Sequence, residues 1–110
     1  MIDIHIKRNH KGFIESFTMN GHALFEEHGK DIVCAGASAV SFGTINAIHA
    51  LTGITPEIHQ GNDGFLSCHL PEKLPKDIHE KAQLLLEGMV ISLQTIEEQY
   101  GEHIKITFKE

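Results

Sequence analysis

The feature that most constrains the fold is a long apolar stripe in the last third of the chain. Apolar side chains recur there at spacings of four and three, as they do along one face of an α-helix. The stripe consists of Ile78, Ala82, Leu85, Met89, Leu93, Ile96 and Tyr100. We expect the helix to start near Asp77, which forms a capping-box-like pair with Glu80, and to end at Gly101. Such a helix is long enough to cross a whole small domain.

A second stripe with the same spacings predicts another helix, which Thr52 and Gly53 end. Its members are Val33, Ala37, Val40, Thr44, Ala47, Ile48 and Leu51. In the longer helix, four further apolar residues widen the apolar face beyond what one contact needs. These are Leu84, Leu86, Val90 and Ile91, and they favour either wider coverage of a sheet or contact with a second subunit.

The remaining segments alternate between apolar and polar residues, with the period of two typical of strands. Residues 2–6 and 13–19 flank a turn and predict a hairpin in which Phe13, Phe17 and Met19 share one face. Residues 54–60 and 65–70 flank Gly61-Asn62-Asp63-Gly64 and predict a second hairpin, and residues 104–108 a last strand. The order β-β-α-β-β-α-β predicts one α+β domain over residues 1–110, with two helices packed on a mixed or antiparallel sheet.

The charge balance limits the partners. Fifteen acidic and nine basic side chains give a net charge of −6, which repels a phosphate backbone and attracts a basic peptide. We therefore expect no direct contact with nucleic acid. No apolar run approaches membrane-spanning length and the N-terminus alternates between apolar and polar residues, so we expect a cytoplasmic protein without a membrane contact. Cys34 and Cys68 are read as free thiols, with Cys68 a structural residue in the middle of a strand.

The stretch from Gly21 to Ser38 holds the candidate chemistry. Cys34 stands where a loop changes into a helix, and a helix start favours the thiolate. His22 lies twelve residues upstream at a strand exit. The residues alone leave two readings open: a nucleophile with its base, or a buried cysteine near a helix cap.

Three neighbours of Cys34 have candidate supporting roles. Asp31 is a good N-cap for the helix, although its carboxylate could instead orient His22. The N–H of Ala35 is a candidate oxyanion donor. Ser38, one turn further along, either bonds within the site or back to its own helix. We expect no metal and no cofactor, because neither a Cys-x-x-Cys nor a helical His-x-x-x-His pattern occurs.

The pattern Gly21-His22-Ala23, Gly29, Asp31-Ile32-Val33-Cys34 and Ser38 resembles the signature of the ribosomal-processing cysteine protease family, Prp. The resemblance extends to chain length and element order. It implies a cysteine endopeptidase with Cys34 as nucleophile and His22 as general base.

The resemblance also implies a substrate and an assembly. The substrate would be the N-terminal extension of the precursor of large-subunit ribosomal protein twenty-seven, cut after an aromatic residue, and the enzyme would be a homodimer. The loop between the two catalytic residues, flanked by Gly21 and Gly29, is expected to close over the peptide. Two alternatives remain: a non-catalytic binder of ribosomal precursor segments, and a thiol redox sensor.

Overall fold

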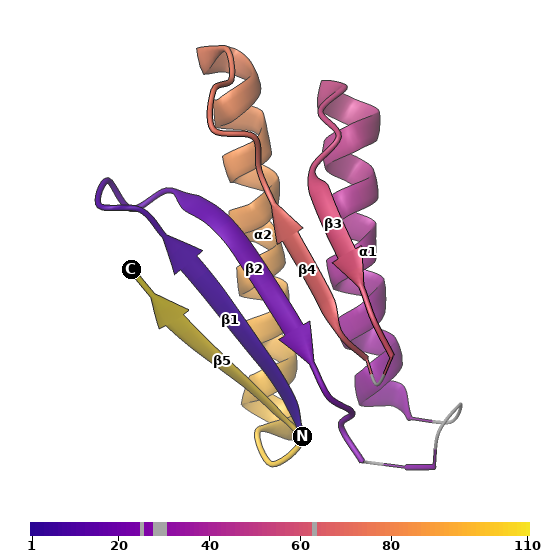
Figure 1. Ribbon diagram of the computed structural model, residues 1–110. Coiled ribbons are helices and arrows are strands. Elements are labelled where there is room, and N and C mark those ends of the chain that lie inside the picture. The colour runs from indigo at the N-terminus through magenta and orange to yellow at the C-terminus, as the bar shows by residue number, and fades with distance from the viewer. Residues whose placement is uncertain (25, 28–30, 63) are drawn as a thin grey trace.

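The structure, a computed structural model, describes residues 1–24, 26–27, 31–62 and 64–110. Two long helices cover one face of a five-stranded sheet (Figure 1). The elements in chain order are β1 (Ile2–Arg8), β2 (Ile14–Asn20), α1 (Ile32–Thr52), β3 (Glu57–Gln60), β4 (Leu66–His69), α2 (Lys76–Tyr100) and β5 (Ile104–Lys109). The predicted α+β order is confirmed.

The sheet is mixed, with the strand order β3-β4-β2-β1-β5. Three neighbouring pairs are antiparallel, and β5 runs parallel to β1. The strand β3 lies at one edge of the sheet and begins directly after Pro56. Proline has no N–H, but at an edge position this removes no hydrogen bond from the interior of the sheet. Because β2 is central, its end at Asn20 directs the following segment toward the start of α1 (Figure 1).

A β-bulge changes the face assignment at the start of β2. Arg8 pairs with Ile14 and Lys7 pairs with Ser16, so Glu15 has no partner on β1. Ile14, which is 1% exposed, therefore joins Phe17 in the core, while Phe13 is 41% exposed. The prediction that Phe13 shares a face with Phe17 is wrong because strict alternation does not survive an extra residue.

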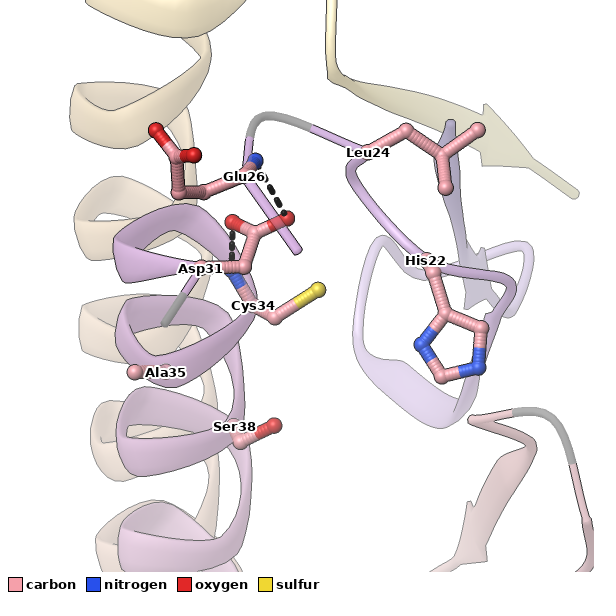
Figure 2. A pocket seen from close by; sticks show the side chains of 7 residues that line it. All are labelled: His22, Leu24, Glu26, Asp31, Cys34, Ala35 and Ser38. Carbon is pink, nitrogen blue, oxygen red and sulfur yellow. Dashed lines mark hydrogen bonds between the residues drawn. The ribbon is translucent and has the colours of Figure 1, made fainter. Parts of the chain in front are cut away.

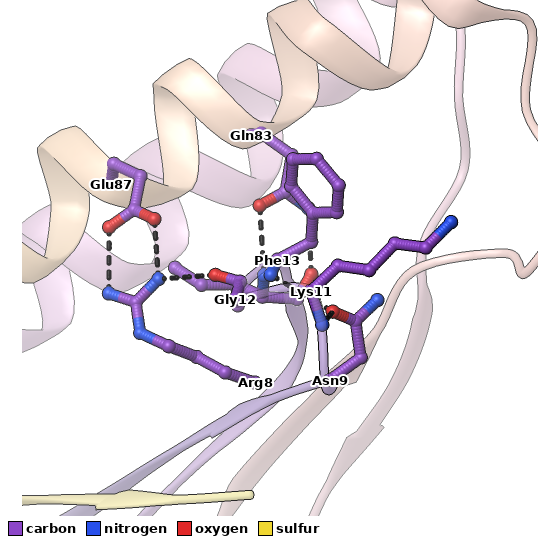
Figure 3. A network of polar contacts seen from close by, with 8 residues as sticks. Arg8, Asn9, Lys11, Gly12, Phe13, Gln83 and Glu87 are labelled. Atoms are coloured by element: carbon purple, nitrogen blue, oxygen red, sulfur yellow. Dashed lines mark hydrogen bonds and ion pairs between the residues drawn. The ribbon is translucent and has the colours of Figure 1, made fainter.

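Polar contacts from α2 hold this bulge in place (Figure 3). The buried Gln83 side chain accepts the N–H of Ile14 at 2.9 Å and donates to its carbonyl at 2.8 Å. One turn further along, Glu87 forms a bidentate ion pair with Arg8, with distances of 2.5 and 2.8 Å. These contacts tie the first hairpin to α2.

The N-terminus of α2 differs from the prediction. The helix is capped by Pro75, which makes no side-chain capping bond, so the capping box at Asp77 and Glu80 is not formed. Asp77 is already the second helical residue and therefore cannot occupy the cap position.

The broad apolar face of α2 divides into two parts. Leu86 and Val90 lie in the core, at 1% and 3% exposure. Leu84 and Ile91 remain exposed, at 75% and 65%. Of the four additional apolar residues on α2, two therefore pack in the core beneath the sheet and two remain on the surface.

The helix α1 packs on the same core through Val33, Ala37, Ser41, Ile45 and Ile48. It has 21 residues and a window of mean hydropathy 1.4, so by length and composition alone it is long and apolar enough to cross a membrane. The expectation that no run approaches this length is wrong. The core helix of a globular domain can meet the same criterion, and here α1 packs along α2.

Candidate active site

Cys34 lies in the first turn of α1, and Asp31 fixes that turn. Asp31 is the N-cap residue, and its Oδ1 atom accepts the N–H groups of Val33 at 2.9 Å and Cys34 at 3.0 Å. Asp31 is itself only 6% exposed. The capping carboxylate therefore sets the position of the cysteine main chain from inside the protein.

The N–H of Ala35 is not available to an oxyanion. It donates to the main-chain carbonyl of Asp31 at 3.0 Å, which is the first hydrogen bond within the helix. The expectation that Ala35 supplies an oxyanion donor is therefore wrong in this arrangement. The amides of Val33 and Cys34 already bind the Asp31 side chain, so the cap satisfies the donors that sequence reasoning treated as open.

The surroundings of Cys34 shift the pKa of its thiol in opposing directions. Desolvation by burial raises the pKa of Cys34. The N–H of Ala23, which donates to Sγ at 3.2 Å, lowers this pKa, and the nearby carboxylate of Asp31 raises it. The net direction is upward, chiefly because of burial, and so opposes the stabilisation of a thiolate that the helix start alone predicts.

His22 lies two residues after the end of β2, on a closely packed turn. Gly21 has φ of 93°, and a Cβ there would lie 2.4 Å from the carbonyl oxygen of Met1. Gly64, in the β3–β4 connection, has φ of 76°, and a Cβ there would lie 2.4 Å from the carbonyl oxygen of Gly21 and 3.6 Å from Cε1 of His22. Only glycine fits at both positions. Gly29, the other expected loop glycine, lies outside the described residues.

Cys34 and His22 line the same cavity of about 330 Å³. Figure 2 shows Cys34 and Ser38 on the side of α1 that faces the segment carrying His22 and Leu24. The complete lining is His22, Leu24, Glu26, Asp31, Cys34, Ala35 and Ser38. The structure therefore brings His22, Asp31, Cys34, Ala35 and Ser38 of the predicted site residues together around this cavity.

A second cavity of about 220 Å³ adjoins the first and shares Cys34, His22 and Ser38 with it. Its other walls include Phe42 of α1 and Phe65 of the β3–β4 connection, with Met19, Gln60 and Leu66. Sequence reasoning missed these residues, because only the pairing of β4 with β2 brings the second hairpin beside Cys34. Cys34 therefore lines both cavities.

Among the residues that the structure describes, no group of three or more His, Cys, Asp or Glu side chains is arranged to hold a metal ion.

Comparison with known proteins identifies the family. A family model described as cysteine protease Prp matches residues 1–105. The ribosomal processing cysteine protease Prp of Bacillus subtilis is 47% identical over 108 residues, covering 97% of this chain and 96% of that protein. The Staphylococcus aureus (strain Mu50) protein of the same name is 44% identical over 109 residues, covering 99% and 100%.

Solved structures agree with this match. The crystal structure of an essential ribosomal processing protease Prp from S. aureus, in complex with a covalently linked product peptide, has a TM-score of 0.90 at 43% identity, covering 99% of this chain and 100% of that one. A structure of the S. aureus protease with a substrate peptide has a TM-score of 0.84 at 42% identity, with the same coverage. The chain therefore belongs to the cysteine protease Prp family and is a cysteine protease.

Proposed function

We propose that this protein is an endopeptidase in which Cys34 is the nucleophile and His22 the general base. The observation that carries this proposal is their placement: the two side chains enter one cavity from α1 and from the exit of β2. The thiol on α1 is held by a capped helix turn, and the imidazole by a close-packed glycine turn.

The raised pKa of Cys34 shapes the reaction. A raised pKa favours the thiol form, so in the proposed reaction His22 removes the thiol proton as Sγ attacks the peptide carbonyl. The tetrahedral intermediate collapses to a thioester, and the His22 imidazolium gives its proton to the departing amine. Water, deprotonated by His22, then attacks the thioester and releases the carboxylate product and the free thiol.

We propose the N-terminal extension of the precursor of large-subunit ribosomal protein twenty-seven as the substrate, cut after an aromatic residue. The relatives are named ribosomal processing proteases, and one S. aureus structure holds a substrate peptide. The second cavity offers Phe42 and Phe65 as apolar walls for an aromatic side chain. The net charge of −6 attracts a basic precursor.

We further propose that the loop between Ala23 and Lys30, of which residues 25 and 28–30 lie outside the described residues, closes over the bound peptide. Leu24 and Glu26 of this segment already form one wall of the cavity beside Cys34. Hydrogen exchange should show greater protection of this segment with a peptide bound to the C34A variant than without it. Equal protection in the two states would contradict closure.

A homodimer in the cytoplasm completes the proposal. Leu84 and Ile91, seven positions apart on α2, are exposed apolar side chains that a second subunit could cover. Both cysteines are free, as in a reducing compartment. Sedimentation at micromolar concentration should show a dimer that the L84E variant weakens, and a single 12.2 kDa species would contradict it.

The deciding experiment incubates the protein with a precursor peptide and weighs the products. We expect two fragments from the wild type and none from C34A or H22A, with C68A as the matched cysteine control. Peptide binding without cleavage by the wild type would instead indicate a binder. A sulfenate or mixed disulfide at Cys34 without cleavage would indicate a redox sensor, which the raised pKa of Cys34 disfavours.

A further inference from the structure

The imidazole of His103 is connected to Cys34 through a single main-chain residue. Its Nδ1 atom lies 3.0 Å from the carbonyl oxygen of Ala23. The N–H of the same Ala23 donates to Sγ of Cys34 at 3.2 Å. His103 lies in the turn between α2 and β5, eighty positions from Ala23, so no local sequence pattern indicates the connection.

The contact between His103 and the Ala23 carbonyl shows which ring nitrogen of His103 carries a hydrogen. A carbonyl oxygen can only accept a hydrogen bond, so Nδ1 of His103 must be the donor. In the neutral imidazole this places the hydrogen on Nδ1 and leaves Nε2 without one.

The two bonds fix both peptide groups of Ala23. The N–H that reaches Sγ belongs to the peptide that joins His22 to Ala23, whereas the carbonyl held by His103 belongs to the next peptide. That second peptide leads into Leu24, which has φ of 57° and a side chain that is 76% exposed. Such a conformation is unfavourable for leucine and needs support from its surroundings.

His103 is a rigid source of this support. Its N–H donates to the carbonyl of Tyr100 at 2.8 Å, and its carbonyl accepts the N–H of Ile2 at 2.9 Å. The next residue, Ile104, is fully buried at the start of β5. The ring is thus carried by the end of α2 and by the parallel β1–β5 pair, and the Ala23 methyl group is buried in the same core.

We propose that His103 is a positioning residue for the active site, which holds the Ala23 carbonyl and thereby keeps the His22–Ala23 peptide directed at Sγ of Cys34. This inference rests on the proposed roles of Cys34 and His22. Without the His103 donor, the Ala23 carbonyl loses this hydrogen bond, and the His22–Ala23 peptide is held less tightly toward Sγ of Cys34. The reaction then loses the alignment of base and nucleophile while both side chains remain present.

Two neutral substitutions of similar size separate donation from packing. The Asn side chain in H103N offers an N–H close to the place of Nδ1, whereas the Leu side chain in H103L offers none. For cleavage of a precursor peptide, we expect H103L to lower kcat by about tenfold or more with little change in KM, and H103N to restore much of the loss.

A second measurement does not depend on proteolysis. The Ala23 hydrogen bond lowers the pKa of Cys34, so its loss should move the pH dependence of Cys34 alkylation by iodoacetamide to higher pH. Mass spectrometry of peptides identifies the alkylated cysteine. We expect this shift in H103L and a smaller one in H103N. Folded H103L and H103N variants with the same kcat and the same alkylation profile as the wild type would overturn the proposal.

A third measurement uses the wild type alone and so remains valid if a variant does not fold. The ¹⁵N shifts of the His103 ring should show a hydrogen on Nδ1. A ring with hydrogen on Nε2 alone would overturn the proposal. If the wild type does not cleave the peptide, the proposed function is rejected instead. The alkylation profile and the position of the ring hydrogen then decide whether His103 positions Ala23.

Discussion

Oδ1 of Asp31 accepts the N–H of Cys34 at 3.0 Å, so the carboxylate that caps α1 also places its charge beside the thiol. The same group therefore holds the cysteine in position and opposes its ionisation. Burial, the largest cause, and this charge both raise the pKa of Cys34, which favours activation of the sulfur by a base over a stored thiolate.

Asp31→Asn should separate these two effects. Asn keeps an oxygen that can accept the two amides but carries no charge, so the helix stays capped and the pKa of Cys34 falls toward its ordinary value. Alkylation of Cys34 by iodoacetamide should then reach its half-maximal rate at lower pH than in the wild type. Asp31→Ala is the control, and it should cost about 0.5–2 kcal/mol of stability through loss of the cap. An unchanged alkylation profile in D31N would contradict the electrostatic argument.

Gly64→Ala should impair cleavage, whereas Gly12→Ala should not. Both glycines have positive φ, so each substitution costs about 1–2 kcal/mol of unfolding free energy through backbone strain. Only at Gly64 does the added Cβ meet a neighbour, the Gly21 carbonyl at 2.4 Å, beside the His22 ring. Denaturant unfolding and peptide cleavage measured on both variants check this. Equal activity in the two would show that the contact does not position His22.

Gln83→Leu should be strongly destabilising. It leaves the N–H and carbonyl of Ile14 buried without their partners, which we expect to cost about 2 kcal/mol or more in urea unfolding. The control is Glu87→Gln on the same helix. Arg8 lowers the pKa of Glu87, so that pair contributes at neutral pH and is lost as the pH falls. Because the Glu87 side chain is 42% exposed, we expect a cost of about 1 kcal/mol or less. A larger loss in E87Q than in Q83L would contradict this ranking.

Cys68 should make the fold sensitive to alkaline pH. Burial raises its pKa to about 11 from an ordinary value of 9.0. Below pH 9 both states keep the thiol proton; between pH 9 and 11 only the unfolded state loses it, so stability falls as the pH rises. The loss should approach about 3 kcal/mol. Urea unfolding of the wild type and of C68A at several pH values isolates this contribution as a difference. A difference that does not vary with pH would rule it out.

The elements and much of the candidate site could be predicted from local patterns. The spacing along Ile78–Tyr100 and the alternation in residues 2–6 depend only on which faces of a helix or strand are apolar, and the structure confirms both elements. The capping residue and the cysteine are likewise three positions apart in one helix turn, so their proximity is a matter of sequence.

The bulge at Glu15, the approach of Gly64 to Gly21 and the contact of His103 with Ala23 were decided by the tertiary structure. Each joins segments whose distance in space depends on strand order and register, which local periodicity does not encode. The pKa of Cys34 was likewise decided by the tertiary structure. A helix start by itself favours the thiolate, but burial and the charge on Asp31 outweigh it, and both depend on how the folded chain surrounds the sulfur.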